Sequence, residues 1–362
     1  MSYQDYINKM KDIQEDILNF VDDKDNQNDY FNKLINAIKI HNIQQNHDDL
    51  MILLHLIASI SNNHHRGPFF FEKIERILNF LKEDIKKNFP NFKIFNIFKD
   101  NKRILLFLIK EDILKVDSSI KTKMKNMNSS YFEFFSPEVG LNFHDDQPNF
   151  LEKRKIGEND DNLCSIIRND MIDEFVTFVN TRNVSLSYQF KTSIYETNPF
   201  LIDKNPTLIE YAAFFGSIQI FNYLRLNKVD LTPSLWIYAI HSNNAEIISL
   251  LENNKIEPND KKFNECFKES VKCHHNEIAT YIKEQKIEDE EDEKESVDEN
   301  GFNKKMIDTF NAQNCIRYYN FCFIQDDFMN GYNFNVLCEC DYVYFVSSLI
   351  DKESINPNAN YI

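Results

Sequence analysis

Four residues in the C-terminal half of the chain are of the types, cysteine and histidine, that can serve as zinc ligands. They are Cys266, Cys273, His274 and His275. Zinc ligands must converge on a tetrahedron, and structural sites usually supply them as closely spaced pairs such as Cys-x-x-Cys. This segment has no such pair, and neighbouring histidines at a helix end point apart. We therefore expect a structural role. The alternative is a metal- or ligand-binding regulatory protein that uses the Cys/His group near Cys273.

Two further histidines, His64 and His65, come just before Arg66 at the end of a predicted helix. Positive or hydrogen-bonding groups there suit the free carbonyl groups of the helix. The chain contains no Gly-x-Ser-x-Gly nucleophile motif, and its 6 glycines leave no loop that could wrap a phosphate. We expect no catalytic residue, no cofactor and no metal, so the chain is predicted not to be an enzyme.

The composition narrows the class of partner. A net charge of -16 disfavours nucleic acid and favours basic protein partners. The apolar runs are far shorter than the ~20 residues that span a bilayer, and the first residues lack the apolar core of a secretory signal. The 7 cysteines are scattered, which suits reduced thiols. We expect an intracellular, cytoplasmic protein without membrane insertion, and self-association stays open.

The elements that would position any site follow one pattern, best seen in "TLIEYAAFFGSIQIFNYL", Thr207 to Leu224. Around Gly216, apolar residues recur three or four positions apart on both sides, which predicts two short helices joined at the glycine. The same offsets return around other residues, called anchors here. The anchors are Asp170, Gly216, Asn243, His274 and Asp341.

The anchor residue types share a tolerance for the left-handed backbone that ends a short helix. A further anchor is predicted at Asn314, and Asp100 precedes a half-formed unit. The repeat-packing core predicted from these offsets consists of Ile209, Ala212, Ala213, Gly216, Ile220, Leu224, Trp236, Ala239, Ile247, Leu251, Phe267, Ile278, Ile282 and Leu349.

The stretch "TLIEYAAFFGSIQIFNYL" is similar to the ankyrin consensus. Together with "RKIGENDDNLCSIIRNDMIDEFVTFV", "LWIYAIHSNNAEIISLLE" and "CHHNEIATYI", it resembles a family of degenerate ankyrin-repeat proteins that carry a domain of unknown function and are expanded in parasitic protists. The specific resemblance covers about Lys153 to Tyr281. It implies an intracellular binding array with no assigned activity. Glu210 stands where the ankyrin pattern usually has the histidine that links neighbouring repeats. The hydrogen bonds between repeats should therefore differ from those of the consensus.

We therefore expect an all-α protein with a helical N-terminal module followed by an ankyrin-type helix-turn-helix repeat solenoid. The predicted parts are a helical module (1–115), a linker or irregular joint (116–159), ankyrin-like repeats (160–286), an acidic loop (287–301) and degenerate C-terminal ankyrin repeats (302–362). The expected function is a non-enzymatic protein–protein interaction scaffold that uses the concave face and loops of the stack. If the chain is instead a shortened family member with a folding role only, its last pair should expose an apolar face.

Overall fold

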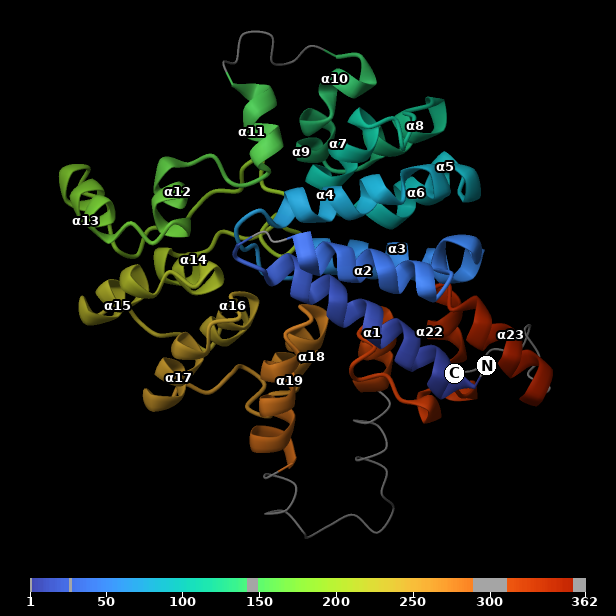
Figure 1. Ribbon diagram of the computed structural model, residues 1–362. Coiled ribbons are helices and arrows are strands. Elements are labelled where there is room, and N and C mark those ends of the chain that lie inside the picture. The colour runs from blue at the N-terminus through green and yellow to red at the C-terminus, as the bar shows by residue number, and fades with distance from the viewer. Residues whose placement is uncertain (1, 26–27, 142–148, 289–310, 354–362) are drawn as a thin grey trace. The chain divides into compact units, whose positions relative to one another are not determined.

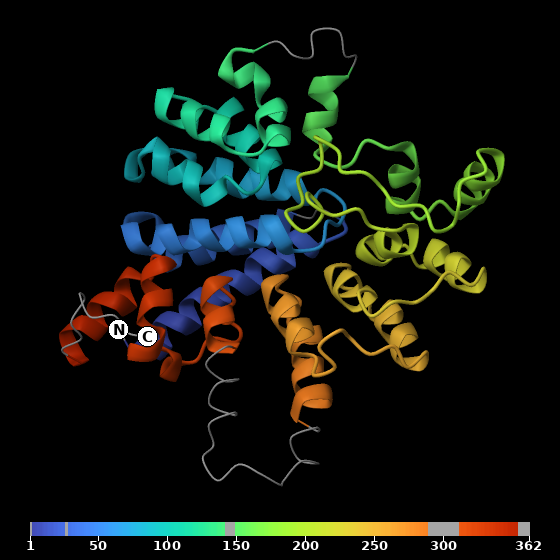
Figure 2. The same ribbon diagram turned by 180° about the vertical axis from the view of Figure 1, so that it is seen from behind.

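The computed structural model describes residues 2–25, 28–141, 149–288 and 311–353, and Figures 1 and 2 show it from opposite sides. Over these residues the regular secondary structure is helical, and Gln189 and Thr207 form an isolated antiparallel bridge. The all-α class is therefore confirmed for the described residues. The chain divides into two compact units, called here the terminal unit (1–60, 67–74 and 262–362) and the central unit (61–66 and 75–261).

The terminal unit contains helices from both ends of the chain. They are α1 (Tyr3–Asp22), α2 (Asn28–Ile40), η1 (Ile43–Gln45), most of α3 (His47–Asn63), the start of α4 (Phe70–Phe80), α18 (Asn264–Lys272), α19 (Asn276–Ile282), the π-helix η2 (Lys283–Glu288), η3 (Asp326–Phe328), η4 (Gly331–Asn333), α22 (Phe334–Glu339) and α23 (Val343–Glu353). Another helical segment covers 311–317. Ser2 and Asp5 form a capping box that starts α1.

Helix α1 covers the last helix pair of the chain. The ring of Tyr6 stacks on Tyr344 with 4.9 Å between centroids and meets Phe345 edge-on at 5.1 Å. Phe345 and Leu349 are buried. Within the described residues, the last pair is thus partly covered by a segment from the other end of the sequence, in the place of a following repeat, while Val343 remains exposed.

The first half of the central unit is a series of short helices. They are α5 (Lys82–Asn88), α6 (Asn91–Phe98), α7 (Lys102–Lys110), α8 (Ser118–Asn126), α9 (Ser129–Phe134), α10 (Ser136–Val139) and α11 (Phe150–Ile156). Four of these lie in the predicted irregular joint over 116–159, which is a correction. Asp117 and Asn128 cap α8 and α9, Pro137 lies in the first turn of α10, and Gly140 ends it with φ 84°. Pro137 and Gly140, residues typical of irregular segments, therefore mark the two ends of a helix here.

Three helix pairs complete the central unit. They are α12 (Asn162–Arg168) with α13 (Ile172–Thr181), α14 (Leu208–Phe215) with α15 (Ile218–Leu226), and α16 (Leu235–His241) with α17 (Ala245–Asn253). The two helices of each pair pack together, and the first helices α12, α14 and α16 pack in succession (Figures 1 and 2).

The anchors have the backbone that the sequence predicts. Asp170, Gly216, Asn243, His274 and Asp341 have positive φ angles between 49° and 70°. After four of them, the next N–H donates to the carbonyl four positions before the anchor, as Ser217 does to Ala212 at 2.9 Å. These are the hydrogen bonds of a Schellman helix end. The prediction that each anchor ends a short helix is confirmed.

Two predicted anchors are wrong. The left-handed residue of the 311–324 segment is Tyr319, with φ 55°, and not Asn314. In the half-formed unit Asp100 does not have a left-handed backbone, whereas Asp112, which follows α7, has φ 54°. An aromatic residue rarely adopts this backbone, so a choice by residue type favours the nearby asparagine.

The predicted core residues lie in the interior with one exception. Ile209, Ala212, Ala213, Ile220, Leu224, Trp236, Ala239, Ile247, Leu251, Phe267, Ile278, Ile282 and Leu349 are buried. Gly216 is half-buried and ends α14 with φ 70°. The predicted acidic loop lies outside the described residues from position 289 onward.

Candidate functional site

Side chains tie successive helix pairs of the central unit together. The Ser217 hydroxyl, after the second anchor, donates to the Ile167 carbonyl of the preceding pair at 2.5 Å. The Asp170 carboxylate accepts from the N–H groups of Gln219 and Ile220, both at 3.0 Å, and so caps a helix of the next pair. The anchors therefore do more than end helices, because the residues at and after them bond to the neighbouring pair.

Glu210 takes part in a different tie. Its carboxylate accepts from the N–H of Thr207 at 2.9 Å, which completes a capping box at the start of α14. It also accepts from the Ser234 hydroxyl at 2.7 Å, at the start of the next pair. A carboxylate thus joins these two pairs at the position where the ankyrin pattern has histidine.

A corresponding tie occurs in the terminal unit. The Asn320 amide, directly after the left-handed Tyr319, donates to the Val271 carbonyl at 2.9 Å and to the Asn276 side chain at 2.8 Å. This bond joins the 311–324 segment to α18 and α19. Its position relative to Tyr319 matches that of Ser217 relative to Gly216.

The first helices α14 and α16 have little free surface. Their side chains are buried except for Glu210, Phe215 and Ile237, which are half-buried. Part of the cover is the irregular segment before α14, because the Phe200 ring lies 5.1 Å from Tyr238 and 4.2 Å from His241 between centroids. The face of the first helices that Phe200 contacts is therefore covered by the chain itself.

A cluster of buried charges lies between the end of α3 and that irregular segment. Arg66 is 3.7 Å from the Glu196 carboxylate and 3.9 Å from Glu158, and it donates to the Thr197 hydroxyl at 3.1 Å. Glu158 also pairs with Arg168 at 2.6 Å. Burial lowers the pKa of Arg66 and raises the pKa of Glu158, and the two opposite charges offset part of each shift.

The buried carboxylate of Glu196 also holds the backbone. It accepts from the N–H groups of Asn159, Thr197 and Asn198 at 2.8 to 3.3 Å. The sequence offers no signal for this cluster, because Arg66 reads as a helix-end residue and its partners lie far along the chain. Its contacts are those of a structural clamp.

The four Cys and His candidates are all buried, on or beside α18 and α19. Within the described residues, no group of three potential ligands contains more than one of them. Burial raises the pKa of the Cys273 thiol well above its usual range, and the nearby Glu269 carboxylate raises it further. His274 has φ 57° and its ring nitrogen lies 3.3 Å from the Ser59 hydroxyl. The alternative zinc set therefore does not converge.

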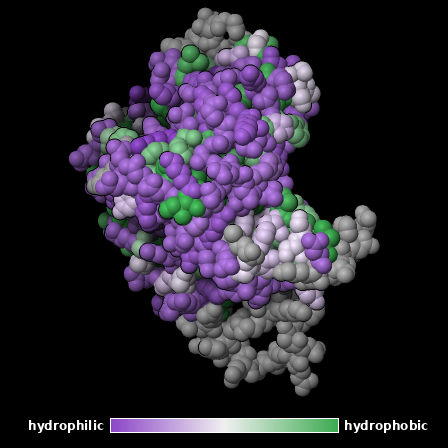
Figure 3. Space-filling view, turned by 45° about the vertical axis from the view of Figure 1, so that its right-hand side comes forward, coloured by the Kyte–Doolittle hydropathy of each residue, from purple (hydrophilic) through white to green (hydrophobic). Residues whose placement is uncertain are grey.

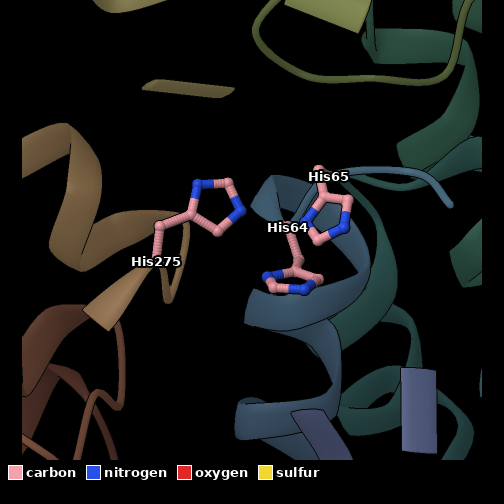
Figure 4. A group of neighbouring side chains, drawn as sticks. All are labelled: His64, His65 and His275. Carbon is pink, nitrogen blue, oxygen red and sulfur yellow. The ribbon is translucent and has the colours of Figure 1, made fainter. Parts of the chain in front are cut away.

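His64 and His65 lie next to each other at the C-terminal end of α3, with ring centroids 4.4 Å apart (Figure 4). His64 is buried and His65 half-buried. Figure 4 also draws His275, which belongs to the terminal unit and stands at the N-terminal end of α19.

Two open grooves lie on second helices of the pairs. One, of about 440 Å³, runs along α13 and is lined by Asn162, Ile166, Asp173, Glu174, Thr177, Phe178, Thr181 and Arg182. The other, of about 620 Å³, runs along α19 and is lined by Asn276, Glu277, Thr280, Tyr281, Glu284 and Gln285. The face in Figure 3 is mostly hydrophilic, with hydrophobic residues in small separate patches.

Within the described residues, no helix combines the length and the apolar character needed to cross a membrane. A scan against protein-family models finds no match, and searches of the curated proteins and of the solved structures find none either.

Proposed function

We propose that the chain is a non-catalytic protein-interaction scaffold built from ankyrin-type helix pairs. The observation that carries the proposal is the recurrence of one packing unit, with a left-handed residue between its helices and side-chain bonds to the next unit. Units of this kind bury a face only against their neighbours and leave an extended surface for partners.

The binding surface in this proposal is formed by the second helices and the loops after them. The grooves on α13 and α19 support this choice, because both lie on second helices. The faces of α14 and α16 are covered by the chain's own segment around Phe200. The proposed binding surface therefore lies on the second helices and not on α14 and α16.

Cross-linked affinity capture from native cells tests the proposal. We expect a small set of proteins at a fixed ratio to the bait. Their recovery should fall for Thr177→Arg on α13 or Thr280→Arg on α19, because a bulky cation then fills a groove. The control is Thr122→Arg, at an exposed threonine on α8. Recovery of no protein above a bait-free column would overturn the proposal.

The four candidates of the metal-binding alternative do not come together within the described residues. Metal analysis of the purified chain tests it directly. Zinc in a one-to-one ratio that is lost in Cys273→Ser would restore it.

A further inference from the structure

The groove on α19 combines an aromatic floor with unpaired negative charge. Tyr281 is 37% exposed. Glu277 and Glu284 also line the groove; Glu277 stands four positions before Tyr281, and Glu284 stands three positions after it, near the start of the π-helix η2. Among the described residues, neither carboxylate has a hydrogen-bond or ion-pair partner. The groove is therefore suited to a cation.

One of the chain's own lysines already uses this ring. The Lys286 ammonium lies 5.6 Å from the centroid of Tyr281 and 5.8 Å from that of Phe263. Lys286 belongs to the π-helix η2, whose i to i+5 geometry brings it back over Tyr281. π-Helices are rare and are frequently found at functional sites. This contact demonstrates that an ammonium fits at the edge of the groove.

We propose that the groove on α19 docks a lysine-bearing segment of a partner protein. In this complex the partner's ammonium replaces Lys286 on Tyr281 and pairs with Glu277 and Glu284, while the alkyl part of its side chain covers the ring. The chain's net charge of -16 favours the approach of a basic partner. This inference rests on the proposed scaffold function and names the class of partner.

The groove on α13 provides the matched control. Asp173 and Glu174 line it and are exposed, so their removal changes the net charge equally. Arg182 lines the same groove and lies 5.7 Å from the Phe178 ring centroid. This arrangement parallels that of Lys286 on Tyr281, so the carboxylates on α13 control for net charge.

The test measures binding of a capped synthetic peptide of lysine, leucine and alanine to the full chain by calorimetry. A peptide with glutamine in place of lysine serves as the negative probe. We expect Glu277→Gln with Glu284→Gln to weaken binding about tenfold, and Tyr281→Ala about threefold, with Tyr281→Phe near wild type. Asp173→Asn with Glu174→Asn should leave the affinity within about twofold. Circular dichroism checks that each variant folds.

A gain of affinity is the most specific outcome. Lys286→Met removes the internal competitor and should tighten peptide binding severalfold, whereas Lys125→Met, with the same charge change on α8, should not. The proposal is overturned if the peptide does not bind the wild type. It is also overturned if the carboxylate substitutions on α13 and α19 weaken binding equally, or if Lys286→Met and Lys125→Met have equal effects. If native partners are still captured by the Glu277→Gln, Glu284→Gln variant, the docking site is wrong and the scaffold function stands. If the wild type captures none, the scaffold function itself fails.

Discussion

At the scale of single residues, Lys102 is the buried group with the clearest pH dependence. Its ammonium donates to the Ile194 carbonyl at 2.7 Å, and burial lowers its pKa from 10.5 to about 8. A lysine whose pKa is lower in the folded state destabilises the fold while it is charged, below about pH 8. That cost disappears as the pH rises toward 10.5.

We therefore expect the unfolding free energy of the wild type, relative to Lys102→Met, to increase by roughly 3 kcal/mol between pH 8 and 10.5. At any single pH, the difference in unfolding free energy between the two proteins also includes the lost hydrogen bond to Ile194. The change of this difference with pH is therefore the quantity that reports on the titration of Lys102. Urea unfolding of both proteins across this pH range measures it. A difference that does not change with pH would show that Lys102 titrates normally.

Arg66 tests whether the buried charge cluster stabilises the central unit. Arg66→Met leaves Glu158 and Glu196 without one of their cations in a buried site, so we expect a loss of about 3 kcal/mol in unfolding free energy. Arg317→Met is the control, since Arg317 pairs with Glu339 at 2.9 Å where both side chains are about half exposed. We expect less than about 1 kcal/mol there. Similar losses for the two variants would argue against a buried clamp.

At the scale of elements, the turn between paired helices depends on the left-handed residue. Gly216 has φ 70°, and an added Cβ would meet its nearest neighbours at 3.4 Å, which is ordinary contact. Gly216→Ala should therefore cost about 1 kcal/mol through backbone strain alone. Lys228 has φ 61° after α15 and is exposed, so Lys228→Gly should stabilise by about 0.5 kcal/mol. Thermal unfolding measures both variants, and we expect Gly216→Ala to destabilise the protein and Lys228→Gly to stabilise it. If both variants are destabilised, backbone strain at left-handed residues is not the cause.

The elements also separate what the sequence can predict from what it cannot. Apolar spacing and residue type locate the anchors at Asp170, Gly216 and His274, because both signals are local. They miss Tyr319, where tertiary packing holds an aromatic residue in a backbone it rarely adopts. Glu196 and its buried partners are also missed, since no local pattern indicates which distant charges will meet.

At the scale of the whole molecule, the terminal unit joins the first helix of the chain to segments near its end. The buried amide of Gln14, on α1, accepts from the Phe321 N–H at 2.6 Å and donates to the Asn320 side chain at 2.9 Å. The Asn320 side chain in turn donates a hydrogen bond to the Val271 carbonyl. The bonds form one continuous chain from α1 through the 311–324 segment to α18, so these elements should unfold as one cooperative unit.

Gln14→Leu tests this coupling. The leucine keeps an apolar volume but leaves the buried Phe321 N–H without its acceptor and the Asn320 side-chain oxygen without one of its donors, so we expect a loss of about 2 kcal/mol. Hydrogen exchange should accelerate in α1 and, to a similar extent, in the 314–324 segment and α22. Gln4→Leu is the control, since Gln4 lies on the exposed side of α1 and donates to Asn8 of the same helix. If exchange accelerates in α1 alone, the C-terminal pairs are stable by themselves, and α1 is a cover that can be removed without unfolding them.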